Sequence, residues 1–126
     1  LRAGHAMGIY PEGHRGKGDL KRFHRGVGYF ALASGAPVVP VTMLGSRDPG
    51  GTVSSLPHKG ARIDMVYGEP FLVDGVGWPR TKEQVQQVTR LLKKHMQVHL
   101  DHALALTGRE LPGPLPPTAD PREFDD

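Results

Sequence analysis

The chain has 126 residues and a mass of 13.7 kDa, which suffices for one domain with a sizeable buried core. It contains no cysteine, so disulfides, thiolate metal sites and a cysteine nucleophile are excluded. Its 17 glycines and 12 prolines follow no Gly-X-Y period, and no apolar run approaches the roughly 18 residues of a membrane span.

Charge divides the chain into two parts. Residues 1–107 hold 14 basic and 8 acidic residues, a net charge of +6, whereas residues 108–126 hold two basic and five acidic ones together with five prolines. We predict a folded body over 1–107 and a Pro-rich, acidic, disordered tail over 108–126. Five cations lie within eleven residues of the body: Arg15, Lys17, Lys21, Arg22 and Arg25. This basic segment favours an anionic partner.

The first elements in chain order are a strand, a loop and a helix. The apolar run 6–10 ends at Pro-Glu-Gly, which predicts a buried strand that delivers the loop 11–21. Residues 26–34 have the length of a helix and are followed by Gly35, a typical helix stop. Residues 37–44 are rich in valine and predict a short strand, in which Pro40 requires an edge or a bulge.

The second half predicts one more strand and one long helix. Over 62–67, Ile63, Met65 and Tyr67 alternate with other residues, as in a strand. Thr81 and Gln84 have the spacing of a capping box before a long amphipathic helix. Its apolar face is formed by Val85, Val88, Leu92, Met96, His99, Ala103 and Leu106. This order predicts an α/β fold, a largely parallel sheet flanked by helices, and the few elements predict an incomplete domain.

Four blocks of the chain resemble one enzyme family. The run GIYPEGHR at 8–15 is similar to the G-x-F-P-E-G-T-R block of the glycerolphosphate and lysophosphatidic acid acyltransferases. FHRG at 23–26, APVVPV at 36–41 and GEP at 68–70 resemble further blocks of that family, in the same order. The resemblance covers about residues 4–74 and implies an acyltransferase-like domain, of which this chain is the C-terminal half.

The resemblance implies a reaction and a phosphate site. The reaction moves an acyl group from an acyl-CoA or acyl-carrier-protein thioester to the hydroxyl of a lysophospholipid or glycerol-phosphate acceptor. It needs no metal or other cofactor. It takes place at the cytoplasmic face of a membrane, and the anionic surface of that membrane is an expected partner. Arg15 inherits the family's role of binding the acceptor phosphate, and Glu12 and Gly13 inherit that of shaping the site.

The residues themselves also favour phosphate binding. Gly13 permits a close approach of the backbone, and Arg15 offers a planar fork that can bind phosphate through two hydrogen bonds. His14, Lys17 and Arg25 complete the predicted substrate-binding set. His14 and Gly16 stand where the family has Thr and Ser, which leaves the headgroup of the acceptor open.

No catalytic residue is predicted in this chain. The family's H-x4-D motif, which holds the general base, lies upstream of Pro-Glu-Gly and is not found here. His14 and Asp19 have the same spacing, but one such pair is close to what chance gives for seven histidines and eight aspartates in 126 residues. The glycines between them also leave the pair poorly fixed.

Three weaker patterns have alternative explanations. Residues 26–31 match G-x-G-x-x-A, with Asp48 at the distance of a ribose contact, but the basic residues before the motif favour tight helix packing instead. His95, His99 and His102 could bind a metal or stabilise the end of a helix. Trp78 could anchor the chain at a membrane interface or pack a loop on the core.

The rival function is a non-enzymatic basic module that binds anionic lipid or nucleic acid. Nucleic acid is not expected, because the few aromatic residues do not alternate with the cations as a stacking surface requires.

Overall fold

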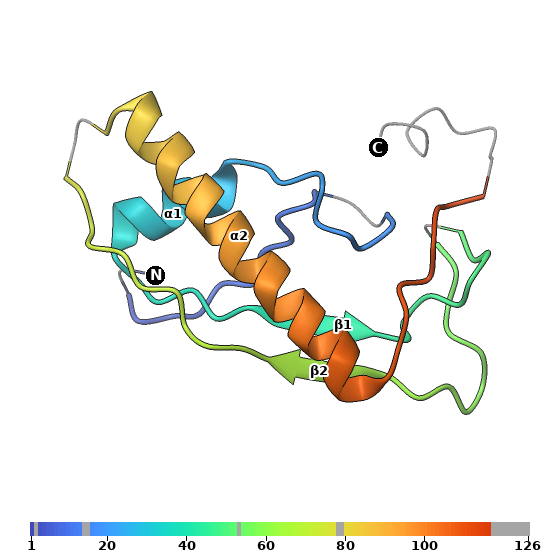
Figure 1. Cartoon of the computed structure of the whole chain (residues 1–126). Helices are drawn as coiled ribbons and strands as arrows, with labels where there is room; N and C mark the ends of the chain where they lie inside the picture. The colour runs from blue at the N-terminus through green and yellow to red at the C-terminus, as the bar shows by residue number, and fades with distance from the viewer. Residues whose placement is uncertain (2, 14–15, 53, 78–79, 117–126) are drawn as a thin grey trace.

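Two helices and one β-hairpin form the regular structure of the residues that are described. The computed structural model describes residues 1, 3–13, 16–52, 54–77 and 80–116. In chain order the elements are α1 (Gly26–Ser34), β1 (Val41–Leu44), β2 (Asp64–Tyr67) and α2 (Lys82–Thr107). The N-terminal half of α2 packs against α1, and its C-terminal half lies across the hairpin (Figure 1).

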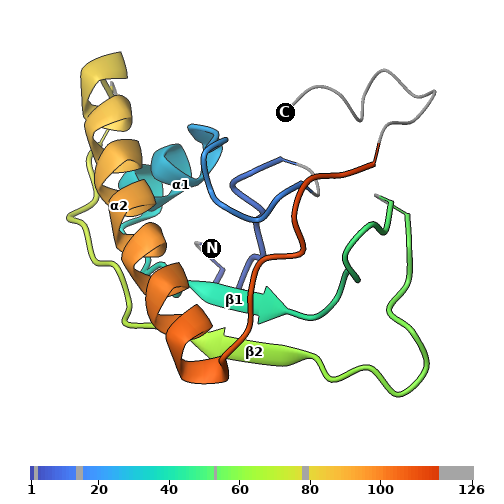
Figure 2. The same ribbon diagram turned by 45° about the vertical axis from the view of Figure 1, so that its right-hand side comes forward.

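The sheet differs from the prediction, because a largely parallel sheet is wrong for this chain. β1 and β2 pair antiparallel, with Val41 opposite Tyr67 and Leu44 opposite Asp64. Parallel neighbours need a crossover, usually helical, whereas the described part of the connection 45–63 contains no helix and runs out beyond the strands before it returns (Figure 2).

The predicted strand at 6–10 is also wrong. No strand is assigned there, and its large side chains Met7, Ile9 and Tyr10 are exposed. An apolar run becomes a buried strand only where a neighbouring strand and a covering layer are available, and the described residues supply neither to this segment.

Pro40 interrupts the pairing of the hairpin, as expected for a residue that cannot donate a ladder hydrogen bond. Beyond it, Val38 and Phe71 exchange hydrogen bonds of 3.0 and 2.7 Å, and Gly68 donates to the Pro40 carbonyl at 2.9 Å. Three residue steps separate Val38 from Val41, but four separate Tyr67 from Phe71, so the second strand carries a bulge.

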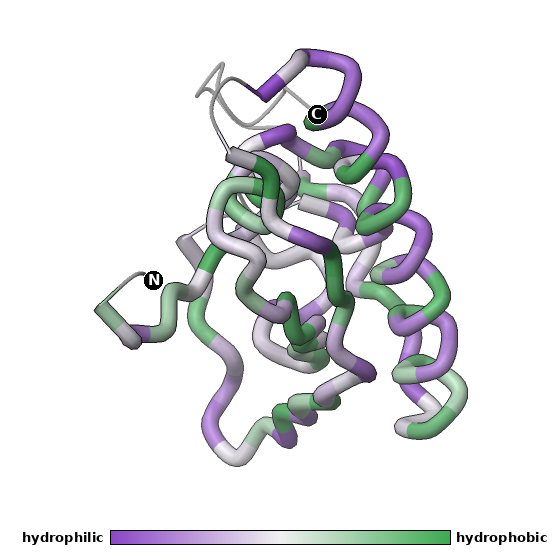
Figure 3. The backbone as a smooth tube through the Cα atoms, turned by 90° about the vertical axis from the view of Figure 1, so that its left-hand side faces the viewer, coloured by the Kyte–Doolittle hydropathy of each residue, from purple (hydrophilic) through white to green (hydrophobic). Residues whose placement is uncertain are grey.

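Both predicted helices are confirmed, together with their end signals. α1 ends at Gly35, which has φ 66° and donates its N–H to the Ala31 carbonyl. At the start of α2, Gln84 donates its amide to Thr81 Oγ1 at 3.1 Å, and the Thr81 amide donates to Gln84 Oε1 at 2.9 Å. Apolar and polar residues alternate along α2 in the order that an amphipathic helix requires (Figure 3).

The hydrophobic core lies between α1 and α2. Ala31 and Leu32 of α1 pack with Val88 of α2, and Leu92 is completely buried. Gly28 faces Thr89 across the contact, where a Cβ would overlap Thr89 Oγ1 and lie 3.2 Å from Thr89 Cα. The glycine therefore permits the close approach of the helices, which is the packing role that the sequence favoured over dinucleotide binding. Leu106, predicted on the buried face of α2, is exposed instead.

The segment after α2 returns to the hairpin. Arg109 Nε donates to Asp64 Oδ2 at 2.5 Å, and its guanidinium also donates to the Arg62 carbonyl. The hydrogen bond from Arg109 lowers the pKa of Asp64 below its ordinary value. Residues 108–116 are thus described in contact with the body, while 117–126 lie outside the described residues.

The first test concerns the contact between the helices. Gly28→Ala places a methyl group against Thr89, so we expect it to lower the free energy of unfolding by about 1–3 kcal/mol. Gly26→Ala is the matched control in the same helix, because a Cβ there meets nothing within 4 Å. Urea unfolding followed by circular dichroism measures both. Equal stability of the two variants would contradict the close packing of α1 on α2.

The second test uses pH. Because the pKa of Asp64 is lower in the folded chain, its ionised form stabilises the fold above the unfolded pKa, and this contribution is lost as pH falls through the folded pKa. Asp64→Asn should therefore destabilise the chain at about pH 7, and this destabilisation should shrink as the pH falls below about 3.9, the ordinary pKa of an aspartate. Asp74→Asn, at an exposed aspartate, is the control. A destabilisation by Asp64→Asn that does not change with pH would show that the ion pair is not its cause.

Candidate anion-binding site

The turn at Pro11 packs against the segment that leads into α1. The His24 amide donates to the Pro11 carbonyl at 2.7 Å, and the Gly13 amide closes the turn on the Tyr10 carbonyl at 3.0 Å. Gly13 has φ +82°, and a Cβ on it would lie 2.6 Å from His24 Nε2. Only glycine meets both conditions without strain. Two of the blocks singled out in the sequence, around 11–13 and 23–26, are therefore neighbours in space.

The loop between these two blocks is held at several points. Lys93 of α2 donates from Nζ to the Lys21 carbonyl at 2.9 Å, and the Lys21 amide donates to the Asp19 carboxylate at 3.1 Å. Leu20 is buried and has φ 60°, a left-handed conformation that costs about 1–2 kcal/mol in a residue with a Cβ. Burial of a leucine side chain gives about 1.5–3 kcal/mol and offsets that cost.

The N-terminus of α1 is electropositive. Arg25 is its N-cap residue and makes no side-chain cap hydrogen bond, and the first turn contains no acidic residue. A helix N-terminus carries a partial positive charge, and a cation at that end adds to it. Arg25 and Lys17 are both exposed. This end of α1 thus combines free amide donors with positive charge, an arrangement that favours anions.

The predicted substrate-binding residues are only partly placed. Gly13 and Arg25 are brought to neighbouring segments by the contact with His24, Lys17 is exposed on the loop between them, and Glu12 is partly buried. His14 and Arg15 lie outside the described residues, so the predicted phosphate clamp and the His14–Asp19 pair remain sequence predictions.

Arg47 is a structural residue that the sequence reasoning missed. It is 4% exposed, and its guanidinium donates to three carbonyls, those of Gly51 at 2.8 Å, Gly16 at 3.4 Å and Gly113. These acceptors lie in three segments that are far apart in the sequence. A single arginine in a Gly- and Pro-rich connection gives no signal of such contacts, because both distant acceptors are backbone atoms.

Asp48, considered above as a possible ribose contact, pairs with His58. His58 Nδ1 lies 2.9 and 3.0 Å from the two carboxylate oxygens of Asp48, and the His58 amide donates to the same carboxylate at 3.1 Å. The hydrogen bond from the His58 side chain lowers the pKa of Asp48. This pair joins two points of the connection between β1 and β2 that are ten residues apart.

The histidines of α2 fix the helix on the hairpin. Because a carbonyl oxygen can only accept, the histidine Nε2 atoms are the donors. His95 donates to the Glu69 carbonyl at 2.7 Å, and His99 donates to the Val66 carbonyl at 2.9 Å. Within the described ranges no three His, Cys, Asp or Glu side chains are grouped to hold a metal ion. His95 and His99 therefore each have a backbone partner on the hairpin side, whereas His102 is exposed.

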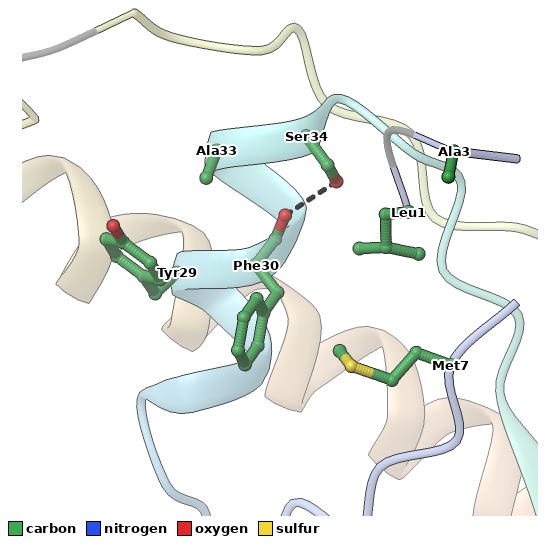
Figure 4. A pocket seen from close by; sticks show the side chains of 7 residues that line it. All are labelled: Leu1, Ala3, Met7, Tyr29, Phe30, Ala33 and Ser34. Carbon is green, nitrogen blue, oxygen red and sulfur yellow. Dashed lines mark hydrogen bonds between the residues drawn. The ribbon is translucent and has the colours of Figure 1, made fainter. Parts of the chain in front are cut away.

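An apolar depression of about 450 Å³ opens beside α1 (Figure 4). Its lining consists of Leu1, Ala3, Met7, Tyr29, Phe30, Ala33 and Ser34. Arg80 places its guanidinium carbon 5.6 Å from the centroid of the Tyr29 ring, a cation–π distance. The wall that Tyr29 and Phe30 form thus offers apolar surface with a cation beside it.

Comparison with family models, with curated proteins and with solved structures gives no match for this chain. Among the residues that the structure describes, no helix combines the length and the apolar composition needed to cross a membrane. Trp78, the possible interfacial anchor, lies outside those residues.

Proposed function

We propose that this chain binds the phosphate group of a lysophospholipid or glycerol-phosphate acceptor between the turn at Pro11 and the start of α1, and that the bound acceptor receives an acyl group from a thioester. The observation that carries the proposal is the packing of Gly13 on His24. It joins two of the blocks that resemble the acyltransferases, the first of which carries the predicted phosphate-binding residues Gly13 and Arg15. The proposal rests on this local arrangement and not on a shared fold.

Electrostatics supports the phosphate half of the proposal. A phosphate near Arg25 would accept hydrogen bonds from the free amides of α1 and would neutralise a cation placed at the positive end of the helix. Arg15, two residues after Gly13, would add a planar fork with charge-assisted hydrogen bonds. An exposed Lys17 raises the local concentration of anions without fixing their geometry.

The apolar depression supports an acceptor that also carries a hydrocarbon chain. Tyr29 and Phe30, which line it, follow Arg25 by four and five residues along α1. At a rise of 1.5 Å per residue, these positions lie about 6–8 Å along the helix axis from Arg25. A ligand with a phosphate at the N-terminus of α1 can therefore extend an apolar chain along the same helix.

In the proposed reaction the acceptor hydroxyl oxygen attacks the carbonyl carbon of the thioester. The new C–O bond forms and the C–S bond breaks, while a general base takes the hydroxyl proton and passes it to the departing thiolate, which leaves as the thiol. The role of this chain is to hold the phosphate so that the hydroxyl is oriented for attack. The proposal assigns the base to no residue of the chain.

The third test measures acceptor binding by titration calorimetry at low salt. Arg25→Gln should weaken binding of glycerol 3-phosphate by about 10- to 100-fold, because a charged hydrogen-bond partner contributes roughly 1.5–3 kcal/mol. Arg15→Ala should have an effect of the same size. Arg90→Gln, which removes an exposed cation of α2 and gives the same net charge, is the control for Arg25→Gln. Lysophosphatidic acid should bind more tightly than glycerol 3-phosphate, since it adds apolar contact.

The basic-module alternative gives a different result. Binding through diffuse charge would treat sulfate and glycerol 3-phosphate alike and would weaken equally in Arg25→Gln and Arg90→Gln. That outcome would contradict a phosphate site at α1.

A further inference from the structure

One face of the hairpin is covered by α2, and the opposite face is apolar and exposed. Side chains alternate between the two faces of a strand, so positions 41 and 43 point to the same side as their partners 67 and 65. The inward residue Leu44 is buried, whereas Val41, Met43, Met65 and Tyr67 are 41, 48, 50 and 66% exposed. Val39 and Ile63 continue the same alternation and are also exposed. We call these six residues the outer sheet face.

The outer sheet face is large for an exposed apolar surface. Residues of this size expose on the order of 200 Å² each in an extended chain, so six at these fractions present roughly 600 Å² of residue surface, backbone included. Contiguous apolar patches beyond a few hundred Å² mark interaction sites on soluble proteins. An isolated two-stranded hairpin is only marginally stable in water, and here α2 supports it on one face alone.

We propose that the outer sheet face binds the same face of a second copy of this chain. Two such faces would bury at most about 1,200 Å² from these residues, which is the lower limit of specific interfaces. None of the six side chains is charged. Two copies can therefore meet there without placing like charges together, although the body of each carries a net charge of +6.

The geometry of the face suits a two-fold contact. In an isologous interface each residue of one copy meets its counterpart on the other around the symmetry axis. The pair Met43 and Met65 lies directly across the two strands near the middle of the face. Methionine side chains are unbranched and adapt to an opposing surface. The dimer thus has four methionines at its centre, with Val41 and Tyr67 beside them.

Sedimentation velocity over a series of concentrations tests the proposal. The natural chain should show a reversible monomer–dimer equilibrium, and Met65→Lys should raise the dissociation constant at least tenfold, because it buries a charge opposite its copy. Val98→Lys is the matched control, since Val98 is an exposed apolar residue of α2 outside the face. Circular dichroism confirms that each variant is folded.

A cysteine variant provides an independent measurement that does not depend on a destabilising substitution. The chain has no cysteine, so Met65→Cys introduces a single thiol. Near the two-fold axis it should form a covalent dimer rapidly on mild oxidation, whereas Val98→Cys should not. A natural chain that stays monomeric at all concentrations would overturn the proposal, as would equal cross-linking of both variants. A monomer that binds neutral phosphatidylcholine vesicles, and loses that binding in Met65→Lys, would assign the face to lipid instead.

Discussion

Gly28 and Thr89 lie so close together that no side chain fits between α1 and α2 where the helices meet. This contact brings Ala31 and Leu32 onto Val88 and encloses the core of the chain. It also fixes the direction of α1, since a helix of nine residues has too few internal hydrogen bonds to be stable alone. The N-terminus of α1, and with it Arg25, takes its position from this packing.

The loop before α1 is also held in place by contacts with the rest of the fold. α2 holds it through Lys93 and the Lys21 carbonyl, the buried Arg47 holds the Gly16 carbonyl, and His24 closes on Pro11. Each contact fixes a backbone atom, so Lys17 and Lys21 remain exposed on a supported main chain. A binding site needs this combination of a rigid backbone and accessible charge.

Local signals in the sequence were sufficient for the helices. Gly35 and the Thr81–Gln84 capping box act within one turn of the chain, so their meaning does not depend on distant partners. The sheet could not be predicted in this way. Residues 6–10 and 37–44 have similar apolar character, and only the availability of partners separates an exposed segment from a paired strand.

For the site, Gly13 was identifiable from its turn, whereas Arg47 acts on the carbonyls of distant glycines, which leaves no pattern in the sequence.

The central claim is that an anion binds at the N-terminus of α1 beside the Pro11 turn. An NMR titration of the ¹⁵N-labelled chain with glycerol 3-phosphate, followed by amide chemical shifts, tests it most directly. Saturable shifts should be largest for the amides of Gly13, Gly26, Val27 and Gly28, because these lie in the turn and in the first turn of α1. Shifts that are small there, or that spread evenly over the lysines and arginines of α2, would contradict the claim.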